Sequence, residues 1–234
     1  MIKIYGKNCV YEAIKANSKI KELYILDTII RKDKNILDIL DKKGYKYTLV
    51  NKSKMDSLFP DGNQGYGAIR DDYFIYDESY IKELSNSSRV LLLDGIQDPH
   101  NLGAIIRSVD AFGYDFIILP KNRSAFINQT VAHVSTGAIE HVKIGYVNSL
   151  LSAVKELKDL GYWIVSTDAS GNTLSENIDK SLKLAIIIGS EGFGISKTLL
   201  NQSDFILSIP MVGHVNSLNA SVSTGIILKD LMKG

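Results

Sequence analysis

Cysteine is almost absent from the sequence, since Cys9 is the only one among 234 residues. A lone cysteine excludes a disulfide within the chain and a metal cluster held by several of its own thiolates. The four histidines, at positions 100, 133, 141 and 214, show no spacing typical of metal ligands. We therefore predict that the protein holds no metal.

Long apolar runs are also missing. No stretch approaches the roughly 20 apolar residues that a membrane-spanning helix needs. The first residues, MIKIYGKN, carry two lysines and no apolar segment, so they do not resemble a signal peptide. With 45% hydrophobic and 23% charged residues, the composition is that of an ordinary globular protein. We expect a cytoplasmic protein with no membrane partner, long enough for a small domain and a medium one.

The net charge is only +1, but the charges are unevenly distributed along the chain. Residues 1–70 contain 14 lysines and arginines against 8 acidic residues, which leaves 13 basic against 18 acidic residues in the remainder. An excess of +6 in the first part indicates contact with a polyanion. A solvated lysine-rich surface would give the same count, so charge alone leaves both interpretations open.

Residues 1–75 have the pattern of a small α/β domain. GKNCVYEAIKAN places Val10, Ala13 and Ile14 on one face of a helix, and KNILDILDKKG is a second helical pattern that ends at Gly44. KELYILD and YKYTLV are typical of strands, and SKMDSLF of a short helix. NQGYGAIR brings two glycines to the start of a further predicted strand.

The remainder of the chain predicts a linker and a larger α/β domain. Residues 76–88, YDESYIKELSNSS, are polar and lack a sustained apolar period, so we predict a linker there and a second domain over 89–234. Strand patterns are RVLLLDGI, YDFIILP, VKIGYV, YWIVSTDA, LKLAIIIGSE and DFILSIPM, with helical patterns at 101–113, 148–160, 195–202 and 219–233. Continuous apolar strands separated by helices predict a parallel sheet covered on both faces. Ligands of such sheets bind beyond the carboxyl ends of the strands.

Three loops follow predicted strand ends and are rich in polar residues or glycine. DPHNLGAIIRSVDAFG begins a helix that Asn101 can cap, and it leaves Arg107 off the apolar face. The glycines of IIIGSEGFGIS let a ligand approach the backbone, and Glu191 there suits a cationic or hydroxyl-bearing ligand. In IPMVGHVNSLNASVSTG, Ser217 or Asn219 can cap the last helix. Taken singly, each loop also fits an ordinary turn between a strand and a helix.

Together and in this order, the three loops resemble the motifs of the SpoU/TrmH family of RNA 2′-O-ribose methyltransferases, within the SPOUT superfamily. HVSTGAIEHV at 133–142 is similar to the Ser-x-Gly-Ala segment of that family. YGKNCVYEAI and NQGYGAI are similar to the small substrate-binding domain of its ribosomal-RNA branch. The resemblance covers nearly the whole chain, and it is closest to the 23S rRNA guanosine-2′-O-methyltransferases.

The resemblance implies a small N-terminal α/β substrate-binding domain and a C-terminal SPOUT domain. This second domain is expected to have a parallel sheet, and its backbone is expected to form a deep trefoil knot. It implies a homodimer with a site completed across the interface, and the small residues of the helix from Asn219 suit such an interface. It also implies methyl transfer from S-adenosylmethionine to a ribose 2′-hydroxyl of RNA, most simply a guanosine of 23S rRNA. A tRNA target is the alternative, and the sequence does not specify the nucleotide.

Site residues are carried over from the family position by position. The positions that bind S-adenosylmethionine, mostly through the backbone, are matched by Gly189, Ile209 and Leu218. The polar active-site positions are matched by Asn101, Arg107, Glu191, Ser217 and Asn219. Arg107 matches the catalytic arginine, often drawn as a general base. Because arginine stays protonated in proteins, clamping the adjacent phosphate and stabilising the alkoxide is physically easier. A valine at position 189 is expected to fill the space that the cofactor needs.

Two other classes of protein remain open at this point. A hydrolase would use one of the serines and one of the histidines near the loops with an aspartate, the candidates being Ser190, Ser217, His100 and His214. The G-x-S-x-G elbow of such enzymes is missing, however. A catalytically inactive RNA-binding module is the other alternative, and the full set of matched polar positions speaks against it. Binding of S-adenosylmethionine separates the methyltransferase from both.

Overall fold

The structure is a computed structural model that describes the chain apart from residues 85–88, 169–170, 172, 215–216 and 233–234. It contains two compact units, which we describe separately. The N-terminal unit consists of Met1–Tyr73 and Ile127–His141, and the C-terminal unit of Phe74–Phe126 and Val142–Gly234. The predicted division of the chain placed residues 127–141 in the second domain, whereas in the structure they pack in the N-terminal unit. Short-range patterns carry no information on such a long-range contact.

The N-terminal unit is built on a four-stranded mixed sheet in the order β1-β4-β2-β3. Its strands are β1 (Ile2–Tyr5), β2 (Ile20–Leu26), β3 (Thr48–Val50) and β4 (Tyr66–Arg70). β4 is antiparallel to both β1 and β2, whereas β3 is parallel to β2. The sequence pattern predicted β2, β3 and β4 but not β1, whose four residues are too few to show a period.

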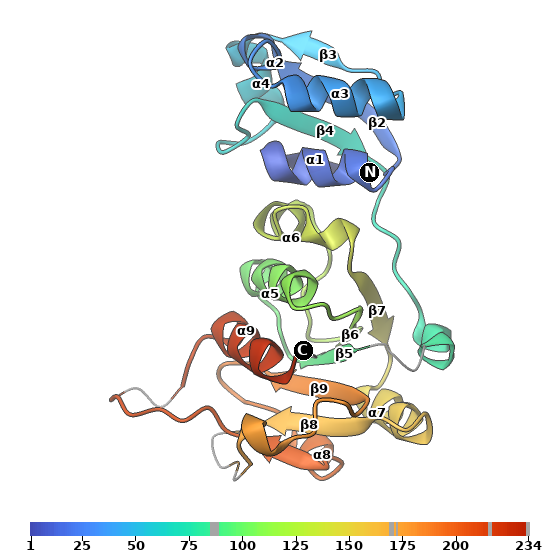
Figure 1. The fold of residues 1–234 in the computed structure, drawn as a ribbon, viewed down its shortest axis with the longest axis vertical. Helices are drawn as coiled ribbons and strands as arrows, with labels where there is room; N and C mark the ends of the chain where they lie inside the picture. The colour runs from blue at the N-terminus through green and yellow to red at the C-terminus, as the bar shows by residue number, and fades with distance from the viewer. Residues whose placement is uncertain (85–88, 169–170, 172, 215–216, 233–234) are drawn as a thin grey trace. The chain divides into compact units, whose positions relative to one another are not determined.

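Helices cover both faces of this sheet (Figure 1). They are α1 (Lys7–Lys15), α2 (Asp27–Ile30), α3 (Lys34–Lys43), α4 (Lys52–Leu58) and α6 (Gln129–Val134), with a 3₁₀ turn η2 at Ala138–Glu140. The predicted apolar face of α1 is confirmed, because Val10, Ala13 and Ile14 are all fully buried. Gly44 ends α3 in the left-handed conformation, also as predicted.

Cys9 lies in α1, where its thiol sits 3.5 Å from the carbonyl oxygen of Ala132 in α6. Burial raises the pKa of this thiol to about 11. We therefore expect the native protein to react very slowly with Ellman's reagent at mildly alkaline pH, because the reactive thiolate is scarce and covered. The rate in urea serves as the control. Fast labelling without urea would mean that α6 does not cover α1 in solution.

The C-terminal unit contains a six-stranded sheet in the order β10-β8-β9-β5-β6-β7. Its strands are β5 (Val90–Asp94), β6 (Phe116–Pro120), β7 (Lys143–Val147), β8 (Trp163–Thr167), β9 (Leu184–Gly189) and β10 (Phe205–Leu207). Every neighbouring pair is parallel, which confirms the predicted sheet and all six strand patterns. β6 and β7 lie on one side of β5, whereas β9, β8 and β10 lie on the other side. Parallel sheets bind ligands at the point where the order of the strands reverses in this way, which here lies between β5 and β9.

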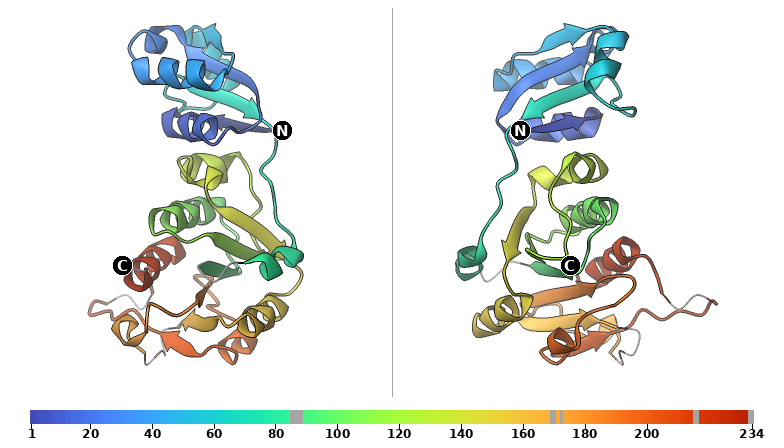
Figure 2. Two further views of the ribbon diagram at one scale, coloured as in Figure 1. Left: turned by 45° about the vertical axis from the view of Figure 1, so that its right-hand side comes forward. Right: turned by 180° about the vertical axis from the view of Figure 1, so that it is seen from behind.

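Both faces of this sheet carry helices (Figure 1). They are α5 (Pro99–Ala111), α7 (Leu150–Asp159), α8 (Lys197–Leu200) and α9 (Ala220–Leu231), with 3₁₀ turns η1 (Glu78–Glu83) and η3 (Ser175–Asn177). α7, α8 and η1 share one apolar core with the sheet. α5 and α9 lie side by side on the other face, as Figure 2 also shows. The predicted helices match α5, α7, α8 and α9, although position 233 at the end of the last prediction lies outside the described residues.

Part of the stretch predicted as a linker is packed into the C-terminal unit. Ile81 is only 1% exposed, and the rings of Tyr76 and Tyr80 make edge-to-face contacts with Phe116 of β6. Three apolar side chains among polar neighbours gave no sustained period, although they suffice to fix one 3₁₀ turn against the core. The last four residues of that stretch, 85–88, lie outside the described residues.

Candidate active site

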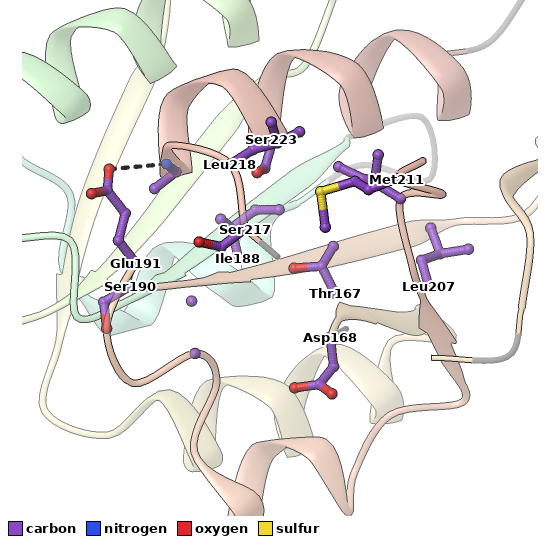
Figure 3. A pocket seen from close by; sticks show the side chains of 14 residues that line it. Thr167, Asp168, Ile188, Ser190, Glu191, Leu207, Met211, Ser217, Leu218 and Ser223 are labelled. Atoms are coloured by element: carbon purple, nitrogen blue, oxygen red, sulfur yellow. Dashed lines mark hydrogen bonds between the residues drawn. The ribbon is translucent and has the colours of Figure 1, made fainter. Parts of the chain in front are cut away.

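The carboxyl ends of β8, β9 and β10 and the start of α9 line a cavity of about 230 Å³ at the edge of the sheet in the C-terminal unit. Gly189 ends β9, Ile209 follows β10, and Leu218 precedes α9. All three residues line this cavity, so the structure brings together the set that the sequence assigned to the cofactor. Figure 3 shows the cavity from close by.

The lining of the cavity combines apolar walls with a few polar groups. The apolar side chains belong to Ile188, Leu207, Ile209, Met211 and Leu218, and the polar ones to Thr167, Asp168, Ser190, Glu191, Ser217 and Ser223. Sequence reasoning missed Thr167, which ends β8, and Asp168, which follows it. Their place at the site depends on β8 pairing with β9, and the order of strands in a sheet leaves no trace in local sequence.

A polar network beside the cavity connects the start of α5, the loop after β9 and the start of α9. Glu191 Oε1 accepts hydrogen bonds from Asn101 Nδ2 at 3.1 Å and from the backbone amide of Ala220 at 3.1 Å, the contact near α9 in Figure 3. Asn219 Nδ2 donates to the same carboxylate and, at 2.9 Å, to Asn101 Oδ1. Three of the five predicted polar residues therefore form one hydrogen-bonded cluster.

Asn219 also caps α9, which confirms one of the two predicted caps for that helix. Its Oδ1 accepts from the backbone amides of Ser221 at 2.9 Å and Val222 at 3.4 Å. The cap fixes the amide of Asn219, so its oxygen faces the helix and its nitrogen faces Glu191. The carboxylate of Glu191 thus lies at the N-terminal end of α9, where it accepts from the backbone amide of Ala220.

The predicted cap of α5 is wrong. Asp98 is the N-cap, and its carboxylate accepts from the backbone amide of His100 at 2.9 Å. Pro99, with its fixed φ, occupies the first turn, so the helix begins two residues before the prediction. Asn101 therefore lies inside the helix, and its side chain is available to bind Glu191 and Asn219.

Gly189 is required by the loop that follows it, rather than by the cavity alone. A Cβ atom at this position would lie 2.2 Å from the carbonyl carbon of Gly194 and 2.5 Å from the amide nitrogen of Ile195. A valine would therefore displace the backbone of the loop before it reached the space of a ligand. The expected effect of that substitution stands, but its physical reason differs from the predicted one.

The other two predicted polar residues lie outside the network. Ser217 lines the cavity. Arg107 is exposed on α5, and its side chain forms no hydrogen bond or ion pair with any described residue. Its neighbour Ser108 faces Gly225 of α9, where an added Cβ would lie 3.6 Å from the hydroxyl. Arg107 thus emerges near the α5–α9 pair with a guanidinium that remains available for an external anion.

The hydrolase alternative gains no geometric support. Among the described residues, no hydrogen bond joins Ser190 or Ser217 to His100 or His214, as a hydrolase would need. Within the same part of the chain, no group of three or more histidine, cysteine or acidic side chains could hold a metal ion. No helix of the described residues is both long and apolar enough to cross a membrane.

Sequence comparison gives matches over both units. A model of the SpoU rRNA methylase family matches residues 88–229, and one for RNA 2′-O ribose methyltransferase substrate binding matches residues 3–69. A Staphylococcus saprophyticus protein named after the TrmH family of tRNA/rRNA methyltransferases is 42% identical, over 99% of this chain and 95% of its own. A Staphylococcus aureus protein of the same name is 43% identical, over 98% and 95%.

Solved structures share the fold. The SpoU methyltransferase AviRb from Streptomyces viridochromogenes, solved with AdoMet, has a TM-score of 0.80 at 23% identity, over 98% of this chain and 88% of that one. An AdoMet-bound rRNA methyltransferase from Sinorhizobium meliloti has a TM-score of 0.78 at 22% identity, over 98% and 86%. The predicted combination of a small α/β part and a parallel-sheet part is therefore confirmed at the level of fold.

Proposed function

Because the chain belongs to the SpoU rRNA methylase family, we propose that it transfers a methyl group from S-adenosylmethionine to a ribose 2′-hydroxyl of RNA. The observation that carries this proposal is the Asn101–Glu191–Asn219 cluster, which stands beside a cavity lined by Gly189, Ile209 and Leu218. A cavity for a cofactor and polar groups for a ribose are the two parts that such a transfer requires.

The lining of the cavity suits S-adenosylmethionine. Apolar walls from Ile188, Leu207 and Leu218 fit the faces of an adenine ring, and Thr167 and Ser217 offer groups for hydroxyls. The carboxylate of Glu191 at the rim suits a ligand that carries a positive charge. When bound, S-adenosylmethionine supplies an electrophilic methyl group on a sulfonium centre.

The chain itself positions and orients the acceptor. Holding a ribose oxygen in line with a methyl group supplies several kcal/mol of rate enhancement, on the order of the proximity effects known for enzymes. Asn101 and Asn219 both donate to Glu191, and these hydrogen bonds orient their amides. Ser217, at the cavity wall, contacts the same ribose in this proposal.

Arg107 acts on the charge that develops during the reaction. Its guanidinium stays protonated, so it clamps the phosphate beside the reacting ribose and stabilises the alkoxide as the 2′-proton leaves. The proton goes to that phosphate or to water. The exposed position of Arg107 on α5 fits a group that meets RNA rather than the cofactor.

The active form in this proposal is a homodimer that completes the site, with the chain of each subunit tied in a trefoil knot. Exposed apolar side chains on α9 support an interface at that helix, since Val222 is 50% and Ile226 36% exposed. Covering such a face with a second copy would remove apolar surface from water. The small residues on α9 allow a close approach.

We further propose that the target is a guanosine of 23S rRNA. The substrate-binding match over residues 3–69 coincides with the segment of basic excess, and phosphate contacts dominate the affinity of proteins for nucleic acids. A large folded RNA offers more phosphates to such a surface. The tRNA alternative has the same chemistry and differs only in the RNA.

The test is methyl transfer from radiolabelled S-adenosylmethionine to unmodified 23S rRNA and tRNA transcripts, with calorimetry of cofactor binding. We expect one labelled ribose in 23S rRNA. Ser223→Leu, which fills the cavity from α9, should abolish cofactor binding, whereas Ser152→Leu on the exposed side of α7 should not. Label on tRNA alone would establish the alternative target. Label on a base, or no cofactor binding, would contradict the proposed reaction.

A further inference from the structure

A second cavity of about 310 Å³ lies in the C-terminal unit, beside the first. The two share Ser190 and Gly194, so the glycine loop after β9 forms a common wall. Leu150, Leu151 and Leu199 contribute apolar surface to the second cavity. Apart from the shared Ser190 and Gly194, no residue assigned above to the cofactor or the reaction lines it, so the proposed function leaves this cavity without an occupant.

Two exposed side chains on its lining are of the kinds that bind single-stranded RNA. Phe193, on the shared loop, is 89% exposed, an unusual exposure for an aromatic ring on an ordered loop. Arg123, on the loop after β6, is exposed and makes no ion pair with any described residue. Aromatic rings stack on bases, and arginine binds phosphates through two parallel hydrogen bonds.

The loop that carries Arg123 is held in place at both ends. The amide of Lys121 donates to the carbonyl of Val147 at 2.8 Å, and the amide of Ala125 to that of Ile96 at 2.8 Å. Tyr146 Oη also donates to the carbonyl of Ala125 at 2.7 Å. Arg123 itself has a φ of 62° in this fixed loop. The arginine is thus presented from a fixed backbone, which lowers the entropy that binding would cost.

The lining also indicates which part of a nucleotide enters. The carboxylate of Asp94, which accepts from the amide of Ser196 at 2.9 Å, would repel a phosphate inside the cavity. A nucleobase has apolar faces and hydrogen-bond donors at its edge, so it suits leucines and an aspartate. Its phosphate would then remain outside, within reach of Arg123.

We propose that this second cavity receives the base of an unstacked RNA nucleotide next to the methylated one, with Phe193 stacked on it and Arg123 on its phosphate. The shared wall places this base adjacent to the ribose held by the Asn101–Glu191–Asn219 cluster. The inference rests on the proposed function for the identity of its occupant as RNA. In this proposal the second cavity selects RNA by the sequence or structure next to the target nucleotide.

The experiment measures binding of an unmodified 23S rRNA transcript to the full-length protein across a series of salt concentrations. Phe193→Ala should weaken binding by roughly 5- to 150-fold, the loss that corresponds to one base stack, and Phe193→Trp should restore it. Arg123→Ala should lower the slope of log K against log[salt] by about 1, as expected for one lost phosphate contact. Affinity for S-adenosylmethionine, measured by calorimetry, should not change.

Matched controls come from the same unit. Phe74→Ala removes a ring that is 76% exposed but does not line the cavity, and Lys155→Ala removes an exposed charge on α7. RNA affinities of the Phe193 and Arg123 variants equal to those of these controls would overturn the inference. A parallel loss of cofactor affinity in Phe193→Ala would also overturn it, because the loop would then act structurally. If the wild-type protein binds RNA but no S-adenosylmethionine, the proposed reaction fails while the RNA comparison still decides this inference.

Discussion

Replacing Arg107 with alanine is expected to lower the turnover number by roughly 10²- to 10³-fold, the loss typical of removing one donor that stabilises developing negative charge. The guanidinium is exposed and does not line the cavity that we assign to the cofactor. Affinity for S-adenosylmethionine should therefore stay the same in this variant. Single-turnover methylation at saturating RNA, beside calorimetry of the cofactor, measures the two quantities separately.

Lysine at position 107 distinguishes a bidentate clamp from a simple positive charge. It keeps the charge but lacks the planar fork, so Arg107→Lys should recover little of the lost activity. Arg31→Ala, which removes an exposed arginine from the N-terminal unit, is the control for lost charge and should leave the turnover number unchanged. Near wild-type turnover in Arg107→Ala would exclude a role of this residue in the transition state, and near wild-type turnover in Arg107→Lys would exclude the bidentate clamp.

The strands and helices of the C-terminal unit were predictable because each has a strong apolar period and a long apolar core face. Leu102, Ile105, Ile106 and Val109 of α5 are all fully buried, as their spacing requires. The start of that helix was misplaced because Pro99 and Asp98 form a better first turn than Asn101 can. Local competition between possible caps is decided by geometry that a single motif does not specify.

The site was predictable in its members but not in its connections. The motifs identified Asn101, Glu191 and Asn219, although their shared hydrogen bonds depend on loops some 90 and 28 residues apart in sequence meeting at one sheet edge. Thr167 and Asp168 escaped notice because only the pairing of β8 with β9 brings them to the cavity. Strand order is a property of tertiary structure, so residues that depend on it carry no local signal.

A buried ion pair lies where residues 127–141 pack into the N-terminal unit, and the second large effect is expected there. Arg70 of β4 and Glu140 of η2 are bonded to each other, with side chains only 8% and 4% exposed. Ser18 Oγ donates to the second oxygen of Glu140 at 2.6 Å, and the guanidinium of Arg70 lies 3.8 Å from the ring centre of Tyr73. Both charges are therefore satisfied inside the unit.

Breaking this pair from one side should destabilise the N-terminal unit strongly. Arg70→Met leaves a buried carboxylate without its cation, and Glu140→Leu leaves a buried guanidinium without its anion; each should cost about 3–5 kcal/mol of unfolding free energy. The double variant should be much more stable than their sum predicts, because no buried charge remains unpaired. Lys21→Met, which breaks the exposed pair with Asp71, is the control and should cost at most about 1 kcal/mol.

Cys9 provides a reporter that responds to this unit and to no other part of the chain. It is the only cysteine, and it is buried at the contact between α1 and α6. Thiol labelling in increasing urea should therefore expose Cys9 at lower concentrations in both single variants than in the wild type. The double variant should recover most of the difference. Strictly additive losses would show that Arg70 and Glu140 are uncoupled, and that apolar contacts of Val131 and Ala132 alone hold residues 127–141 in place.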